Sequence, residues 1–131
     1  MKKGVLLNSE ITAVIAAMGH TDLLTIADCG LPIPDTTKRI DLALTKNVPG
    51  FLETLNAVLL ELEVEEAFIA REMVERSPDL FNALQEKLGN VPIQFITHEE
   101  FKIMTKSAKA CVRTGECTPY ANIILKSGVT F

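Results

Sequence analysis

The sequence predicts an α/β fold: one largely parallel sheet layered with helices, in a single domain over residues 1–131. Short apolar runs alternate with segments whose apolar residues recur at helical spacing, which is the order expected of parallel strands joined by crossover helices. A length of 131 residues suits one domain and is too short for two ordinary ones. The chain has no Trp and only 5% aromatic residues, so its core is expected to be aliphatic and tightly layered.

The first predicted element is a helix between Asn8 and Gly19. Its apolar residues fall at i, i+3, i+4 and i+7: Ile11, Val14, Ile15 and Met18. Asn8 or Ser9 can cap its start, and Gly19 is expected in the left-handed conformation after the last turn. His20 is therefore predicted in a loop directly beyond the helix.

Two strands are expected next. Residues 23–27 form a short apolar run, which favours a strand buried on both faces, with Asp28 at its carboxyl end. Gly and Pro residues at 30–34 then interrupt regular structure. Apolar and polar residues alternate over 40–44, which predicts a second strand.

Pro49 suits the first position of a helix whose apolar stripe extends to Leu62. A strand is predicted at 67–70. Ser77 and Pro78 then resemble a helix start, and Gly89 suits its end.

Residues 92–96 are the next expected strand. Thr97 and Glu100 form a T-x-x-E capping box, which predicts His98 in the first turn of a helix that directly follows this strand. Residues 110–112 and 122–125 are predicted as the last two strands, joined by a loop over 113–120.

Composition and charge exclude several classes of function. The formal net charge is -4 and the thirteen basic residues are scattered, so we expect no nucleic-acid partner. No segment approaches the roughly 20 apolar residues of a membrane helix, and the amino terminus does not resemble a signal peptide. Cys29, Cys111 and Cys117 form no CxxC pair, which fits a reducing cytoplasm better than a disulfide framework.

Chemistry is expected at the carboxyl ends of the strands, where α/β sheets bind ligands, and Asp28 and His98 lie there. The chain has two histidines, which the predicted helices place at opposite helix ends. The field of a helix C-terminus favours an imidazolium at His20, and the field of an N-terminus disfavours one at His98. This biases His20 toward proton donor and His98 toward neutral acceptor, unless burial or neighbouring carboxylates outweigh the helix fields.

Structural roles for the same residues compete with these. Each histidine could be a solvated or capping residue, Asp28 could only cap its turn, and Tyr120 and Asn122 could only close a loop. The glutamates at 61, 63, 65 and 66 are most simply a solvated helix end and edge. A zinc site and a cysteine nucleophile have little support, and phosphate-binding glycine motifs are absent.

Four segments together resemble one family. They are GHTD at 19–22, ADCGLPIP at 27–34, HEEFK at 98–102 and RTGECTPYAN at 113–122. In this order and spacing they are similar to the ribose pyranase branch of the RbsD/FucU sugar-mutarotase family, over essentially the full chain.

The resemblance implies an enzyme that interconverts the pyranose and furanose forms of D-ribose without a cofactor or metal. It implies His20 as the catalytic acid, with Asp28, His98, Tyr120 and Asn122 as sugar contacts. It also implies a ring-shaped homo-oligomer, a homodecamer of two pentamers, in which residues 120–122 reach the neighbouring subunit's site.

These residue types suit the reaction, because ring opening needs a proton donated to the ring oxygen and His titrates near neutral pH. We expect Asp28 to orient His20 or to hold a sugar hydroxyl. Lys102, Arg113 and Glu116 remain open between sugar contacts and ion pairs. The alternatives are a mutarotase of another sugar such as L-fucose, a non-catalytic sugar-binding partner of a ribose transport system and, more distantly, a metal-dependent hydrolase.

Overall fold

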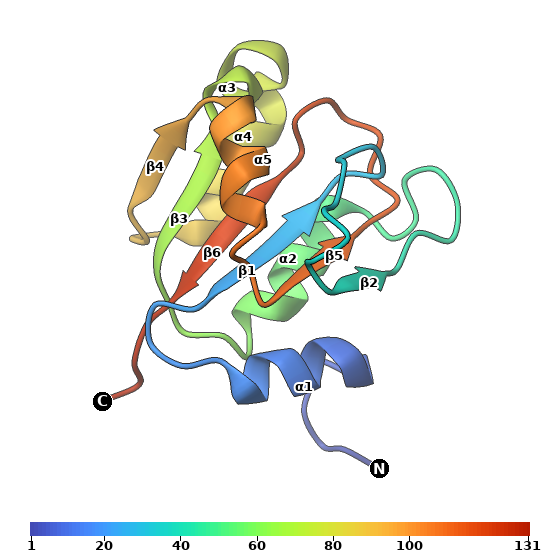
Figure 1. Cartoon of the computed structure of the whole chain (residues 1–131), viewed down its shortest axis with the longest axis vertical. Helices are drawn as coiled ribbons and strands as arrows, with labels where there is room; N and C mark the ends of the chain where they lie inside the picture. The colour runs from blue at the N-terminus through green and yellow to red at the C-terminus, as the bar shows by residue number, and fades with distance from the viewer.

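The computed structural model describes all 131 residues, which form one layered α/β unit (Figure 1). In chain order its elements are α1 (Ser9–Ala17), β1 (Leu23–Ala27), β2 (Arg39–Asp41), α2 (Phe51–Leu59), β3 (Val64–Ala70), α3 (Arg71–Arg76), α4 (Pro78–Leu88), β4 (Ile93–Ile96), α5 (His98–Thr105), β5 (Ala110–Arg113) and β6 (Ile123–Ser127). The predicted α/β class is confirmed, and so are most elements to within one to three residues.

A single six-stranded sheet has the order β2-β5-β1-β6-β3-β4. The pairs β1–β5, β2–β5 and β3–β4 are parallel, whereas β6 runs antiparallel to both of its neighbours, β1 and β3. The sheet is therefore largely parallel, as predicted. The carboxyl ends of five strands and the amino end of β6 share one edge, called here the carboxyl edge.

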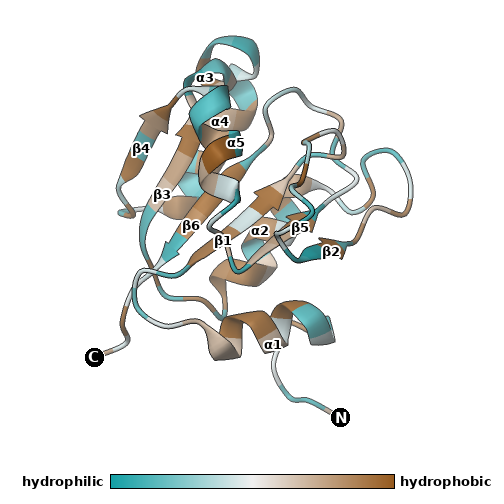
Figure 2. Cartoon of the chain, in the orientation of Figure 1, coloured by the Kyte–Doolittle hydropathy of each residue, from teal (hydrophilic) through white to brown (hydrophobic).

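Helices cover both faces of the sheet. Helix α5 crosses one face, while α2 and α4 pack behind the other (Figure 1). Side chains of the central strands alternate between the two sides, so Leu24 and Ile26 enter a core of 20 buried residues shared with α1, α2 and α4. Ala27 enters a core of 6 buried residues that is shared with Phe101 of α5. Figure 2 shows the central strands as mostly apolar, as a sheet covered on both faces requires.

Two predictions about the first half of the chain are wrong. The strand expected over 40–44 is only β2, three residues long, and Leu44 is exposed beyond it. Leu44 instead joins a turn in which its N–H donates to the carbonyl of Val48. Gly19 does not take the left-handed conformation. Helix α1 ends at Ala17, its C-cap residue Met18 has extended backbone, and the positive φ of 71° belongs to Thr21.

Helix starts also differ from expectation. Pro49 precedes α2 rather than opening it, because Gly50 is the N-cap residue. Helix α4 begins at Pro78 with Ser77 as its N-cap residue, as predicted, although the Ser77 hydroxyl donates to the carbonyl of Pro119 instead of accepting from the helix. Helix α3 was not anticipated, and β3 begins at Val64, which places the expected solvated glutamates of 65 and 66 within a strand.

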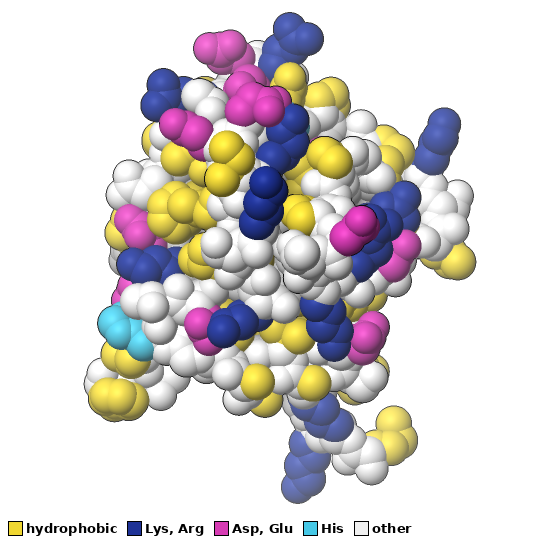
Figure 3. Space-filling view, viewed as in Figure 1, with side chains coloured by type: hydrophobic (Ala, Val, Ile, Leu, Met, Phe, Trp, Pro, Cys, Tyr) yellow, Lys and Arg dark blue, Asp and Glu magenta, His cyan; other side chains and the backbone are white.

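Charged side chains lie mixed over the surface. On the face seen in Figure 3, basic and acidic groups alternate without forming a single basic patch. None of the helices has the length and apolar character that crossing a membrane would take.

Candidate functional site

The carboxyl edge brings together four of the five residues expected in the site: Asp28, His98, Tyr120 and Asn122, called here the carboxyl-edge cluster. Asp28 follows β1, and Asn122, which is fully buried, precedes β6. The Asn122 amide donates to Asp28 Oδ2 at 2.8 Å and accepts from the Asp28 N–H at 2.9 Å. Asp28 Oδ1 also accepts from the Gly30 N–H at 2.9 Å, so the turn-capping role is real. The buried amide and the Gly30 N–H together fix the carboxylate, which is half-buried at the edge.

His98 is the first residue of α5, as predicted. The capping box forms, with Thr97 accepting from the N–H of Glu100 and Glu100 accepting from that of Thr97. The His98 N–H donates to both carboxylate oxygens of Glu72 at 3.2 Å. The His98 ring meets the Tyr120 ring edge to face, with centroids 5.1 Å apart, and its buried Nδ1 has no hydrogen-bond partner within the chain. A buried polar atom without a partner is unusual in a folded protein and is normally explained by a bound water or ligand.

Tyr120 adopts an uncommon backbone conformation. Its φ is 61°, in a region that bulky residues rarely occupy. The Asn122 N–H donates to the Tyr120 carbonyl at 2.8 Å, and Pro119 accepts from Ser77. The surrounding bonds therefore hold the phenol ring at the edge in a conformation that costs energy, as functional residues often are held.

A hollow of about 330 Å³ opens beside the cluster. Its lining is Asp28, Gly30, Leu31, Pro32, Arg76, His98, Pro119 and Tyr120. The lining combines a carboxylate, an imidazole, a guanidinium and a phenol with few apolar groups. Such a set offers donors and acceptors in several directions, which suits a small neutral polyol.

His20 lies at the opposite edge of the sheet. It belongs to a tight turn before β1, whereas Asp28 follows β1, and the five strand residues alone separate the two by about 16 Å. Two hydrogen bonds fix the turn. The Asp22 carboxylate accepts from the Gly19 N–H at 2.9 Å, and the Thr21 N–H donates to the Ser127 carbonyl. The expectation that Asp28 orients His20 is therefore wrong within one chain.

Glu65 is the partner of His20. His20 Nε2 lies 2.7 Å from Glu65 Oε2, and the other Glu65 oxygen pairs with Lys126 Nζ at 2.9 Å. The β3–β6 register shifts between Val64 and Glu66, so an irregularity of the strand aims Glu65 at the histidine. The bonds from Lys126 and His20 lower the pKa of Glu65, against a small opposing effect of burial. The carboxylate is thus ionised near neutral pH and accepts a proton-bearing Nε2, which leaves His20 Nδ1 free.

A second hollow of about 380 Å³ adjoins His20. It lies between the end of α1, the start of β3 and the carboxyl terminus, and includes Met18, Glu63, Gly128 and Phe131. The imidazole is about half exposed there. The chain therefore carries two separate candidate half-sites, His20 with Glu65 at one edge and the carboxyl-edge cluster at the other.

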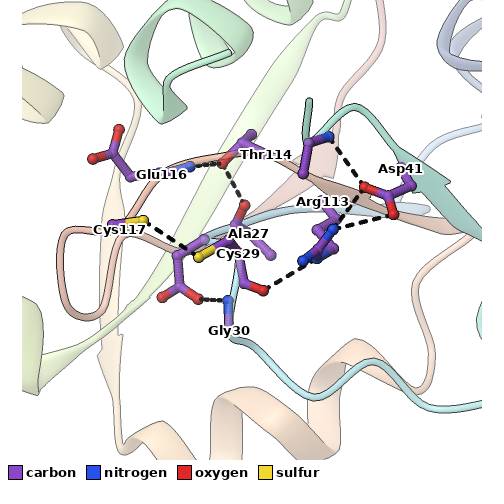
Figure 4. A network of polar contacts seen from close by, with 10 residues as sticks. Ala27, Cys29, Gly30, Asp41, Arg113, Thr114, Glu116 and Cys117 are labelled. Atoms are coloured by element: carbon purple, nitrogen blue, oxygen red, sulfur yellow. Dashed lines mark hydrogen bonds and ion pairs between the residues drawn. The ribbon is translucent and has the colours of Figure 1, made fainter. Parts of the chain in front are cut away.

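The three residues left unassigned by the sequence hold structure. Arg113 Nη1 contacts both oxygens of Asp41 at 3.0 and 3.1 Å, while its Nε donates to the Cys29 carbonyl (Figure 4). Glu116 accepts from the first N–H of α2, at Phe51, at 2.9 Å. Lys102 pairs with Glu99 at 2.6 Å on the surface of α5. Burial favours a raised pKa at Asp41, but the Arg113 guanidinium and the Ala43 N–H outweigh it and the pKa is lowered.

No group of three His, Cys, Asp or Glu side chains lies close enough to bind a metal ion. All three cysteines are free. Burial raises the pKa of the Cys111 thiol to about 12, so this sulfur is a core group with little reactivity.

Sequence reasoning missed three residues. Glu65 looked like part of a solvated acidic run, because nothing in the sequence indicates that β3 starts at Val64 with an irregular register. Glu72 and Arg76 lie on α3, whose six residues are too few to show helical periodicity. The only available signal was their place directly after a strand, at the edge where ligands bind.

Comparisons with known proteins agree over the whole chain. The model of the family described as "RbsD / FucU transport protein family" matches residues 1–130. A D-ribose pyranase of Clostridium perfringens is 62% identical over 131 residues, covering all of both chains.

Solved structures show the same fold. The structure of Bacillus subtilis RbsD complexed with D-ribose has a TM-score of 0.97 at 44% identity, with full coverage of both chains. A fucose mutarotase of Streptococcus pneumoniae in complex with L-fucose has a TM-score of 0.85 at 25% identity, also with full coverage. The chain is thus more similar to the ribose-binding structure than to the fucose-binding one.

Proposed function

The chain belongs to the RbsD / FucU family, and on that premise we propose that it is a D-ribose pyranase, an isomerase that interconverts the pyranose and furanose forms of D-ribose without a cofactor. The observation that carries the proposal is the full-length similarity to D-ribose pyranases and to a structure with bound D-ribose. The lower similarity to the fucose mutarotase favours ribose over L-fucose as the substrate.

The reaction requires proton transfers at two oxygens. The ring oxygen takes a proton as the C1–O bond to it breaks, the anomeric hydroxyl loses one, and an aldehyde forms. After rotation about a carbon–carbon bond, a different hydroxyl attacks the aldehyde and closes the other ring. A histidine serves such steps well, because it gives and takes protons near neutral pH.

His20 is the proposed proton donor. Its Nε2 is engaged by Glu65, so Nδ1 is the atom that gives a proton to the ring oxygen. The Glu65 carboxylate stabilises the protonated imidazole and fixes its orientation, as the carboxylate does in catalytic triads. The sequence predicted a proton donor at His20 from the field of the helix C-terminus. In the structure, the Glu65 carboxylate gives a stronger reason for the same role.

The carboxyl-edge cluster is the proposed sugar-binding part. The Asp28 carboxylate accepts hydrogen bonds from hydroxyls, and the His98 imidazole and the Tyr120 phenol line the same hollow. The fully buried amide of Asn122 contributes by holding Asp28. Neutral hydroxyls need many well-placed bonds rather than a strong field.

One site requires two subunits if His20 and the cluster act on the same sugar. Within a chain these groups lie at opposite edges of the sheet, so a neighbouring chain must bring its His20 edge to the cluster. This supports a homo-oligomer with sites at subunit interfaces, while the ring shape and the homodecamer are what the family resemblance implies. In this arrangement Tyr120 and Asn122 meet the neighbouring subunit's His20, together with Asp28 and His98 of their own chain.

Exchange NMR tests the proposal. The protein is expected to accelerate pyranose–furanose exchange of D-ribose, measured by saturation transfer between anomeric signals, and to act less on L-fucose. His20→Ala is expected to lose at least about 100-fold of the acceleration, the usual contribution of general acid catalysis. Ribose binding with no acceleration would support a non-catalytic transport partner instead, and faster exchange of L-fucose would reassign the substrate.

A further inference from the structure

Two cysteines far apart in the sequence meet at the carboxyl edge. The sulfur atoms of Cys29 and Cys117 lie 3.6 Å apart, although 88 positions separate them (Figure 4). The Cys29 N–H donates to the Glu116 carbonyl at 2.8 Å, and the Cys117 N–H donates to Asn47 Oδ1 at 2.9 Å. Arg113 donates to the Cys29 carbonyl from the other side. Both loop backbones are therefore held where the thiols face one another.

We propose that Cys29 and Cys117 form a reversible oxidation site, at which a peroxide converts the two thiols to an intrachain disulfide. A disulfide needs the sulfurs about 2.05 Å apart, and rotation of two side chains on adjoining backbones supplies the remaining 1.5 Å or so. The inference does not depend on the sugar reaction.

The two sulfurs differ in exposure, which sets the order of events. Cys117 is exposed and Cys29 is half-buried, so the Cys117 thiolate is the one that reaches the oxidant. The hydrogen bond to Cys117, burial and the Asp28 carboxylate raise the pKa of Cys29, which keeps its proton longer. Cys29 is accordingly the resolving thiol.

The chemistry balances with one peroxide. The Cys117 sulfur attacks the O–O bond, becomes a sulfenic acid and releases water. The Cys29 sulfur then attacks the sulfenic sulfur, the S–O bond breaks, and a second water leaves. Two thiols lose two electrons and two protons in total, and the peroxide takes them up. A dithiol reductant reverses the change by exchange.

The bond would join the loop that carries Asp28 to the loop that carries Tyr120. Cys29 directly follows Asp28, and Cys117 lies three residues before Tyr120. In the reduced protein these loops are connected by hydrogen bonds that can open, whereas a disulfide cannot open without a reductant. Oxidation is thus expected to reduce the motion of both loops.

Mass spectrometry of the intact, assembled protein provides the test. After exposure to hydrogen peroxide, the mass is expected to fall by about 2 Da, two of three thiols are expected to resist alkylation, and dithiothreitol is expected to restore both. A non-reducing peptide map should join the peptides of Cys29 and Cys117. The change should persist in Cys111→Ala and disappear in Cys29→Ser and in Cys117→Ser.

Three results would overturn the inference. The first is that all three thiols can still be alkylated after a peroxide dose that oxidises glutathione in the same tube. The others are sulfinic acids on separate cysteines and a disulfide between two chains. Hydrogen exchange gives a second measurement: amides of 28–34 and 115–122 should exchange more slowly in oxidised wild type but not in treated Cys29→Ser. Equal exchange in both would refute the proposed restraint of the loops.

Discussion

The imidazole of His20 and the carboxylate of Glu65 form a 2.7 Å pair at the edge of the sheet remote from Asp28. The pair extends to Lys126, so a cation, a carboxylate and an imidazole lie in a row. Glu65 is ionised, and its second carboxylate oxygen is bonded to Lys126, so the carboxylate has a fixed orientation. The imidazole of His20 is oriented by its bond to this carboxylate. The row acts as a positioning device for a single side chain.

Replacing Glu65 with Gln is expected to slow ribose ring exchange by about 10-fold to 100-fold, part of what a general acid contributes. The amide keeps the shape but loses the charge that stabilises protonated His20. Saturation-transfer NMR between the anomeric signals of D-ribose measures the exchange rate.

Glu66→Gln is the matched control, because Glu66 contacts Lys126 and Gln94 but not His20. It should leave the rate near that of wild type. Equal losses in the two variants would mean that Glu65 acts only through strand stability.

Mixing two inactive variants tests whether one site takes residues from two chains. His20→Ala and His98→Ala subunits, unfolded together and reassembled at equal amounts, should recover about a quarter of wild-type activity by random assembly. Each variant refolded alone should stay inactive. A mixture as inactive as its components, with mixed oligomers verified by native mass spectrometry, would refute the two-chain site.

Asn122→Ala should destabilise the fold by about 1–3 kcal/mol, since it leaves the Asp28 N–H without its partner and frees the carboxylate. Ribose affinity should fall with it, because Asp28 loses its fixed position. Urea unfolding and ribose titration measure the two effects. Asn90→Ala, at an exposed position after α4, is the control, and a similar loss there would argue against the buried pair.

Glu116 predicts a pH dependence of stability. Burial opposes ionisation, but N–H groups of Phe51 and Thr118 and the Thr118 hydroxyl outweigh it and lower the pKa of Glu116 below 4.5. A lowered carboxyl pKa gives stability that is complete above the unfolded value and is lost as pH falls through the folded one.

Wild type should therefore exceed Glu116→Gln by about 1 kcal/mol at pH 7, and the gap should narrow below pH ~4.5. Thermal unfolding from pH 3 to 7 measures this difference. Glu75→Gln, on the exposed side of α3, should show no such gap. If the stability difference between wild type and Glu116→Gln stayed constant with pH, the shape of the side chain rather than its charge would explain it.

Gly115→Ala should cost about 1–3 kcal/mol of stability by crowding. A Cβ there would lie 2.7 Å from the Val48 nitrogen and closer still to the Thr45 and Val48 carbonyls, all backbone atoms that cannot turn aside. Gly19→Ala, whose Cβ would meet only Asp22 Oδ2 at 3.9 Å, is the control in the same urea titration. Similar unfolding midpoints for the two variants would contradict the steric account.

Local patterns predicted much of the fold. The capping box at Thr97, Gly89 with its positive φ of 57° and the apolar run of β1 depend on neighbours in sequence, and all three predictions are confirmed. Gly19 shows the limit, because contacts of Asp22 and Thr21 with β6 decide how that turn is made. Leu44 shows a second limit. The alternation of apolar and polar residues predicted a strand that reaches Leu44, but β2 pairs with β5 over only three residues.

The site was harder to predict than the fold. Four residues of the carboxyl-edge cluster could be named, and the ends of β1 and β4 gave a physical reason for two of them. The distance between His20 and Asp28 was not predicted. The two residues are only eight positions apart in the sequence, but the extended strand between them places them at opposite edges of the sheet. To predict that Glu65 contacts His20, one would need the register of β3 against β6. No local sequence pattern encodes that register.

The location of the two half-sites at opposite ends of β6 has a genetic consequence. The strand has Asn122 before its start and Lys126 near its end, so one short element supports both half-sites of a subunit. In a ring built on two-chain sites, a subunit defective at both ends disables two sites rather than one. When half the subunits carry His20→Ala together with His98→Ala, only about a quarter of the sites would stay intact.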